Sequence, residues 1–167
     1  MEEPKVMVAL RDVETAGSLT KLGCQMANLM GASLMAVHVV EIAAGLPIDA
    51  EEEILDRPGK QVLSLARQVA SNNFSMNITT QLLRARHAGE AIVDEAAEKG
   101  IELLVVGYHH NHGLAETLLG STVQYVSHHA PCKVLVQIPA PKEHAKAVPA
   151  RDTKEELKEV EKRPEAA

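Results

Sequence analysis

The sequence predicts an α/β fold in which helices cover both faces of a five-stranded parallel sheet. Two observations carry this prediction. Short apolar runs alternate along the chain with longer segments whose apolar residues recur at helical spacing. The short runs are also nearly continuous in apolar residues, which is typical of parallel strands that are buried on both faces. Together these features predict a doubly wound, Rossmann-like architecture with ligands beyond the carboxyl ends of its strands.

Nine elements are expected. The predicted strands are Lys5–Leu10, Ser33–Val40, Ile78–Leu83, Ile101–Val106 and Cys132–Ile138. The predicted helices are a segment from Leu19 to Met30, then Gln61–Ser71, Gly89–Lys99 and Leu114–His129, the last with an interruption at Gly120. Glycines at the ends of two helices, Gly31 and Gly100, stand where C-terminal caps are expected.

The segment Glu41–Gly59 is the least regular internal stretch of the chain. It carries two prolines and two glycines around an acidic run, Glu51-Glu52-Glu53. We therefore predict a loop with a short helix, followed by the helix from Gln61, which Asn72-Asn73 is expected to close.

Length and composition predict one domain and a tail. A chain of 167 residues is long enough for one well-buried domain and too short for two ordinary ones. After residue 139 the chain consists mostly of charged residues, Ala and Pro. We predict a domain over residues 1–139 and a charged tail over residues 140–167, mostly disordered or with a short helix.

Composition also argues against several kinds of partner. Aromatic residues make up 2% of the chain and the formal net charge is −6, which argues against nucleic acid and anionic membranes as partners. No apolar run is long enough to insert in a bilayer, and the first residues lack the pattern of a signal peptide. Cys24 and Cys132 are isolated, and we interpret them as buried thiols of a cytoplasmic protein.

The most informative motif follows the fourth predicted strand. Gly107 ends that strand, and Gly120 is followed by two hydroxyl residues, Ser121 and Thr122, at a helix start. Glycine allows a close approach of the backbone and a positive φ, and a helix start offers N–H donors to a phosphate. The alternative is a tight strand-to-helix turn with Ser121 as the helix N-cap.

Charged residues at the end of the first strand are a second candidate. The Asp12 carboxylate is placed to accept hydrogen bonds from a ribose or an adenine edge, or to act as the N-cap of the first helix. Arg11 has two candidate partners, a phosphate and the acidic run at residues 51–53.

A cluster of histidines, His109, His110 and His112, lies between the two glycines of the phosphate motif. Three interpretations stay open. The cluster is an exposed polar loop, a contact for phosphate when protonated, or a set of ligands for a transition metal. No cysteine or carboxylate completes a recognised ligand spacing, so we predict no metal site.

The segment from Leu103 to Ile138 resembles the C-terminal half of universal stress protein domains. Their phosphate motif is a Gly, two residues, a Gly, nine residues, then Gly and Ser or Thr; here Gly107 and Gly120-Ser121 hold the outer positions and His110 the middle one. Ala130–Val136 is similar to their closing strand, and Val37–Val39 to the end of their second strand. Nucleotide-binding members usually carry Asp where this chain has Arg11.

This resemblance implies the sheet order 3-2-1-4-5 and a stress-response module that binds ATP, or a related adenine nucleotide, together with Mg²⁺. It assigns the phosphates to Gly107, His110 and the Gly120–Thr122 segment, and the base to Asp12 and Val39. It also implies a homodimer that forms through the edge strand Val134–Ile138.

Three functions are consistent with the sequence. One is a nucleotide-binding regulatory module. The second is a nucleotide-free dimeric interaction module of the same fold, a companion or detached domain of a membrane transporter. The third is a small enzyme or metal protein that uses the histidine loop. No nucleophile–base pair, Walker loop or carboxylate dyad is present in the sequence, so we predict binding rather than catalysis.

Overall fold

The computed structural model describes residues 3–49, 53–108 and 120–138. The strands are β1 (Lys5–Ala9), β2 (Ser33–Glu41), β3 (Thr79–Ala85), β4 (Leu103–Gly107) and β5 (Lys133–Gln137). The helices are α1 (Val13–Met30), α2 (Glu53–Phe74), α3 (Ala88–Lys99) and α4 (Ser121–His129). The strands pair in parallel in the order β3-β2-β1-β4-β5, as predicted.

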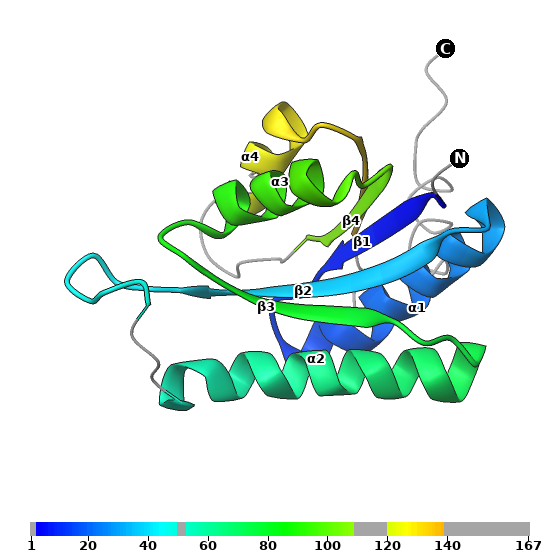
Figure 1. Ribbon diagram of the computed structural model, residues 1–167, viewed down its shortest axis with the longest axis horizontal. Helices are drawn as coiled ribbons and strands as arrows, with labels where there is room; N and C mark the ends of the chain where they lie inside the picture. Colours follow the sequence, from blue (N-terminus) through cyan, green and yellow to red (C-terminus); the bar gives the residue numbers. More distant parts are fainter. Residues whose placement is uncertain (1–2, 50–52, 109–119, 139–167) are drawn as a thin grey trace, which may run out of the picture.

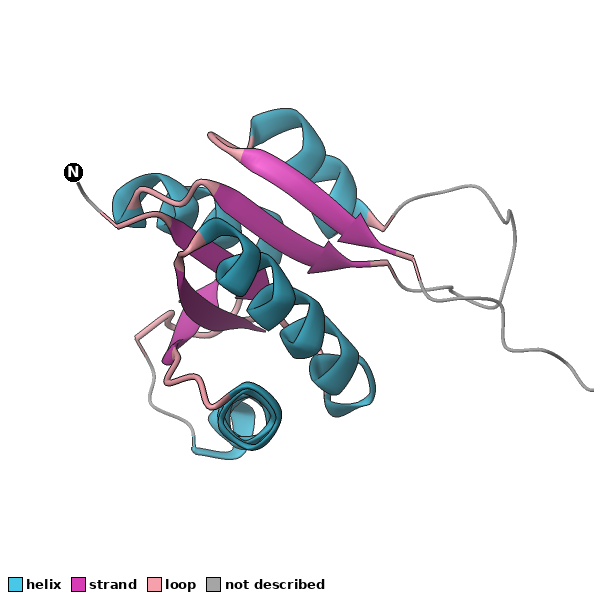
Figure 2. Cartoon of the chain, turned by 90° about the vertical axis from the view of Figure 1, so that its right-hand side faces the viewer, coloured by secondary structure: helices cyan, strands magenta, loops and turns pink. Residues whose placement is uncertain are grey.

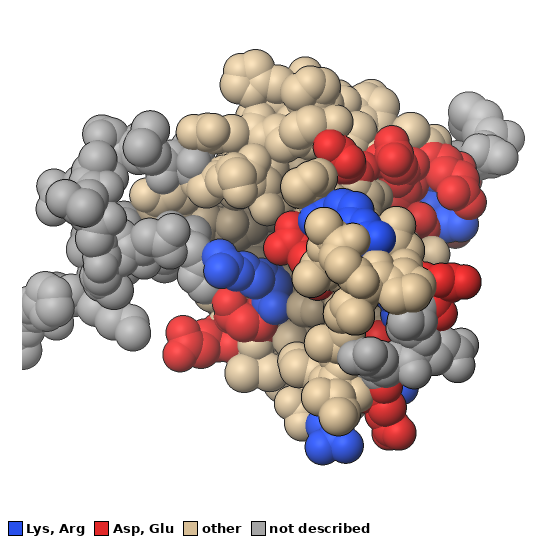
Figure 3. Space-filling model, turned by 90° about the vertical axis from the view of Figure 1, so that its left-hand side faces the viewer, with Lys and Arg blue, Asp and Glu red and all other residues tan. Residues whose placement is uncertain are grey.

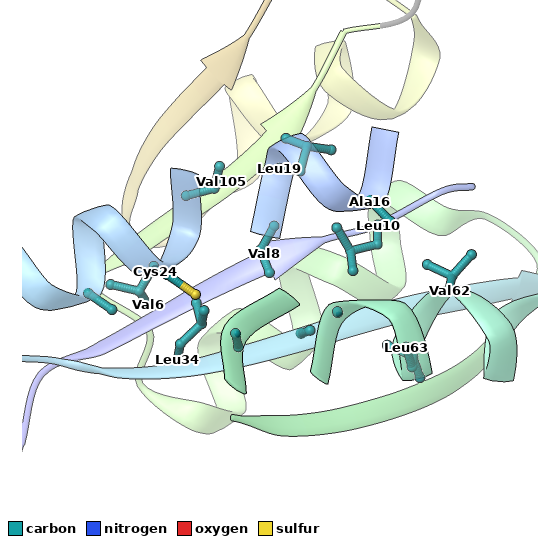
Figure 4. Close-up of a cluster of buried hydrophobic side chains, with 14 residues drawn as sticks. Val6, Val8, Leu10, Ala16, Leu19, Cys24, Leu34, Val62, Leu63 and Val105 are labelled. Carbon is teal, nitrogen blue, oxygen red and sulfur yellow. The ribbon is translucent and has the colours of Figure 1, made fainter. Parts of the chain in front are cut away.

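Helices cover both faces of the sheet, which confirms the predicted layers (Figures 1 and 2). Alternate residues of β1 serve the two faces, because successive side chains of a strand point to opposite sides. Val6 and Val8 pack with α1 and α2, whereas Met7 packs with α3 and α4. Figure 4 shows the first of these clusters, in which side chains of α1, α2 and β1 meet.

The helix α2 differs most from the prediction. It is already helical at Glu53, includes Pro58-Gly59, and continues through Asn72-Asn73 to Phe74. Gly59 does not break the helix; it lets α2 lie close to the sheet, since a Cβ there would stand 2.5 Å from His38 Cδ2 and 2.5 Å from Leu82 Cδ1. The predicted loop therefore ends earlier, and the helix is tied to the sheet by close packing that the local sequence does not reveal.

An ion pair also holds the first turns of α2. Both carboxylate oxygens of Asp56 accept from the guanidinium of Arg84 on β3, with Nε–Oδ1 at 3.2 Å. Asp56 is 5% exposed, so this carboxylate is buried, whereas the Arg84 side chain is half-buried. A two-point Arg–carboxylate contact fixes orientation as well as distance. It ties the part of α2 that contains Pro58 to β3.

The helix ends agree with the glycine prediction. Gly31 (φ 60°) and Gly100 (φ 65°) adopt the left-handed conformation at the ends of α1 and α3, and each donates to carbonyls of the preceding turn. Cys24 is fully buried and Cys132 only half-buried, so the interpretation of both as buried thiols is wrong for Cys132. None of the helices in the described ranges has the length and apolar character that crossing a bilayer requires.

Candidate nucleotide-binding site

A cavity of about 330 Å³ lies at the carboxyl ends of β1, β2 and β4. The sheet order changes direction between β1 and β4, and ligands of doubly wound proteins bind at such a switch point. The lining comes from the strand ends and from the first turns of three helices. It consists of Ala9, Leu10, Arg11, Thr15, Leu19, Val37, His38, Val39, Glu41, Ala88, Ile92, Val106, Gly107, Gly120, Ser121, Thr122 and Val123.

The phosphate motif lies on the α4 side of the cavity. Gly120 is the N-cap of α4, so the prediction of Ser121 as the cap is wrong by one residue. Gly120 makes no side-chain cap hydrogen bond, and Ser121 and Thr122 form the first positions of the helix. The backbone donors of a first helical turn have no partner inside the helix. This end of α4 therefore suits an anion.

The two glycines of the motif serve different purposes, and neither is in the left-handed region. Gly120 has φ −55°, and a Cβ added there meets no atom of the described chain within 4 Å. Gly107 does not have a positive φ, and a Cβ added to it would lie 2.7 Å from Leu19 Cδ1 of α1. The expected positive φ is thus wrong. Gly107 allows α1 to pack on β4, while Gly120 leaves open space on the cavity wall.

Asp12 acts as the N-cap of α1. Its Oδ1 accepts from the backbone N–H of Thr15 at 3.0 Å and from the Thr15 hydroxyl at 3.0 Å. The cap interpretation of Asp12 is therefore confirmed. Asp12 is not among the cavity-lining residues, but its neighbours Arg11 and Thr15 are.

A second part of the cavity wall is formed by residues of β2 and α3. Val39 lines the cavity near Val37 and Ile92, which supply an apolar wall. Glu41, at the end of β2, also lines the cavity, and its Oε1 accepts from the backbone N–H of Ala88 at 2.8 Å. Since His87 makes no side-chain cap hydrogen bond, Glu41 caps α3 in its place. Sequence reasoning missed this residue because the two partners lie on different elements.

His38 is a second cavity residue that the sequence did not single out. Its Nδ1 lies 2.9 Å from the carbonyl oxygen of Leu10, so this ring nitrogen donates to the end of β1. The other edge of the ring packs against Gly59 of α2. Burial lowers the pKa of His38 below its usual value, against the smaller opposing effects of the Leu10 carbonyl and the Asp12 carboxylate. The neutral ring thus joins the site to α2.

The histidine cluster cannot be assigned to the cavity. His109, His110 and His112 lie outside the described residues, so the prediction that His110 contacts a phosphate and the prediction of no metal site both stay untested. Within the described ranges, no group of three or more His, Cys, Asp or Glu side chains is arranged to hold a metal ion. On the face of the molecule that Figure 3 shows, Lys and Arg side chains are interspersed with Asp and Glu side chains.

The fold and the cavity define a Rossmann-like α/β protein with a cavity at the carboxyl ends of its central strands, where ligands of such folds bind. The family model described as the universal stress protein family matches residues 4–137. The chain belongs to this family.

Relatives agree with this assignment over most of their length. The chain is 31% identical over 144 residues to universal stress protein A homolog 2 of Coxiella burnetii, covering 78% of this chain and 92% of that protein. It is 28% identical over 138 residues to universal stress protein MJ0531 of Methanocaldococcus jannaschii, covering 79% of this chain and 80% of that protein.

Solved structures share the fold. UspA from Lactobacillus plantarum superposes with a TM-score of 0.64 and 25% identity, covering 81% of this chain and 98% of that one. A universal stress protein in complex with cAMP gives a TM-score of 0.65 at 20% identity, covering 80% and 96%. The Archaeoglobus fulgidus protein in complex with dAMP gives a TM-score of 0.62 at 19% identity, covering 81% and 97%.

Proposed function

We propose that this chain is a regulatory stress-response module that binds ATP, or a closely related adenine nucleotide, in the cavity between β1, β2 and β4. The observation that carries the proposal is the beginning of α4. Of the three helices whose first turns border the cavity, α1 is capped by Asp12 and α3 by Glu41. The N-cap of α4, Gly120, has no side chain, and among the described residues no other side chain caps this helix. A phosphate group fits the donors that remain there.

The cavity suits the rest of such a ligand. Its volume lies at the lower end of the range for small-molecule sites, roughly 300–1,000 Å³. We place the adenine against the apolar wall of Val37, Val39 and Ile92, and the phosphates against Gly107 and the Gly120–Thr122 segment. The structures of relatives in complex with cAMP and dAMP support an adenine nucleotide. The only carboxylate among the described lining residues, Glu41, is already a helix cap, so Mg²⁺ would enter with the phosphates.

The proposal is one of binding rather than turnover. Among the described cavity residues, the carboxylate of Glu41 and the imidazole of His38 both hold backbone groups of the fold. Neither is placed as an uncommitted general base for hydrolysis.

Calorimetric titration with ATP tests the proposal. We expect measurable binding by the full chain and a loss of about tenfold or more in the Gly120→Ala variant, because the added methyl takes space at the phosphate end of the cavity. Gly17→Ala is the matched control: a Cβ at Gly17 also meets no described atom within 4 Å, and Gly17 does not line the cavity. The absence of binding at millimolar ATP, or equal affinity in both variants, would contradict the proposal.

A homodimer through the β5 edge is a second proposal, favoured by the exposure of that strand. The strand β5 is at one end of the sheet, four of its five residues are only half-buried, and the following Ile138 is 63% exposed. An apolar sheet edge of this kind tends to be paired or covered. Ile138→Lys is the suitable variant, since Leu135 packs against the core. Light scattering should show a dimer that this substitution weakens; a monomer for the parent chain at micromolar concentration would exclude it.

A further inference from the structure

The cavity has one Lys or Arg among its described lining residues, and it is Arg11. The strand register fixes where this residue stands. Ala9 is opposite Val37 on β2 and opposite Val106 on β4. Arg11 follows the end of β1 by two residues, and it lines the cavity together with residues from the ends of β2 and β4. Adjacent strands are about 4.8 Å apart, so an arginine side chain is long enough to extend from the end of β1 to the end of either neighbouring strand.

The charge of Arg11 is not used by the described part of the fold. Arg11 is exposed, and no hydrogen bond or ion pair joins it to the residues described. The nearby acidic groups have other roles, since Asp12 caps α1 and Glu41 caps α3. Of the acidic run that the sequence offered as a partner, Glu53 makes no ion pair with Arg11, and residues 51–52 lie outside the described ranges.

We propose that Arg11 is a specificity-determining residue that contacts a second phosphate group, so that the cavity binds a nucleoside di- or triphosphate more tightly than a monophosphate. This inference rests on the proposed nucleotide site. The first turn of α4 supplies the neutral backbone donors for one phosphate group, and Arg11 supplies a full positive charge for a second. A guanidinium matches phosphate with two parallel N–H donors and stays protonated at all working pH values.

The other use of an arginine in such a site is to stack on the base. The two uses differ in what they demand of the ligand. Stacking strengthens binding of every adenine nucleotide equally, whereas a phosphate contact strengthens only those with the additional charge. They differ also in what they demand of the side chain, because Lys keeps the charge and loses the flat guanidinium. A comparison across ligands and variants therefore separates them.

The test is calorimetric titration of the full chain with AMP, ADP and ATP in the absence of divalent cations. The variants are Arg11→Ala, Arg11→Lys and, as the matched control, Arg57→Ala, which removes an exposed arginine outside the cavity. In Arg11→Ala we expect ATP to bind about five- to tenfold more weakly and AMP less than about twofold more weakly. Arg11→Lys should keep most of the preference for ATP, and Arg57→Ala all of it. The preference of the parent chain should shrink as salt is raised.

Three results would overturn the inference. A parent chain that binds AMP as tightly as ATP has no phosphate preference to explain. An equal loss for all three nucleotides in Arg11→Ala would mean that the residue contacts the base or ribose. Failure of the parent chain to bind any of the three at millimolar concentration would remove the nucleotide site itself, and with it the role of Arg11. Thermal unfolding without ligand should be the same for Arg11→Ala and the parent, which excludes a structural cause.

Discussion

The packing of Gly107 against α1 leads to a prediction about stability rather than binding. A Cβ at this position would stand 2.7 Å from Leu19 Cδ1, where carbon atoms in favourable contact are about 3.5–4.0 Å apart. Leu19 is 2% exposed but also lines the cavity, so its Cδ1, the free end of a flexible side chain, has to shift toward that space. Overpacking of a core costs about 1–3 kcal/mol, and the smaller entropy of the unfolded chain returns about 0.4–1 kcal/mol. The two ranges leave a net cost of roughly 0–2.5 kcal/mol for Gly107→Ala, and because a side-chain end can shift we expect a value near ~1 kcal/mol.

Urea unfolding followed by circular dichroism measures this cost, with Gly120→Ala as the comparison. The Gly120 variant should lose less stability, because its methyl meets no described atom and only the N-cap preference changes. Thermal unfolding should move by roughly 2–4 °C for each kcal/mol in a chain of this size.

A double-mutant cycle identifies the cause of the Gly107→Ala effect. Leu19→Val removes the δ-methyl groups that the new Cβ would meet, so Gly107→Ala should cost much less in that background. If Gly107→Ala lowers the free energy of unfolding equally in both backgrounds, or in neither, the packing of Leu19 does not require a glycine at this position.

Three further predictions concern residues around the cavity. Asp12→Ala removes the cap of α1 and should cost about 1 kcal/mol of unfolding free energy, while Asp12→Ser should recover most of it in the same urea experiment. Because the pKa of His38 is lower in the folded than in the unfolded chain, acid favours the unfolded chain, which takes up a proton first. The contribution of His38 to stability is fully present above about pH 6.5 and is lost as the pH falls from there to the pKa of the folded state. His38→Asn keeps a donor for Leu10 without titrating; its urea midpoint should fall less between pH 7.5 and 5.5, and an equal fall would contradict the assignment. Glu41→Ala should cost about 0.5–2 kcal/mol through lost capping of Ala88, and increased hydrogen exchange at the start of α3 would be the sign.

Much of the fold follows from local patterns in the sequence. The apolar runs predict the central strands most clearly, because a strand buried on both faces needs apolar side chains at nearly every position, whereas the edge strands β3 and β5 are only half-buried. Gly31 and Gly100 end their helices as expected, since the left-handed conformation that they adopt is costly for other residues. The cap at Asp12 also depends only on residues three apart. The sheet order required the resemblance to universal stress proteins, because chain order alone does not specify it.

The errors lie where contacts between distant segments override local preference. Pro58-Gly59 has the pattern of a break, yet α2 runs through it because Gly59 packs under His38 and Leu82, and because Asp56 pairs with Arg84 of β3. The cap that Glu41 provides to α3 joins residues 47 positions apart in the chain. At Gly107 the sequence did not reveal the contact with Leu19 of α1, while the contact of this glycine with a phosphate stays a prediction. The predicted boundary between the domain and its tail at residue 139 stays a prediction.

Amide chemical shifts of the ¹⁵N-labelled chain would locate the nucleotide site without a substitution. On addition of ATP, we expect the largest changes at Val39, Gly107 and the Gly120–Thr122 segment, where the cavity meets the ends of β2 and β4 and the start of α4. AMP should change the same amides and leave Arg11 less affected than ATP does. The absence of any change at millimolar ATP, or changes confined to α2 and β5 away from the cavity, would contradict a nucleotide site at the carboxyl ends of these strands.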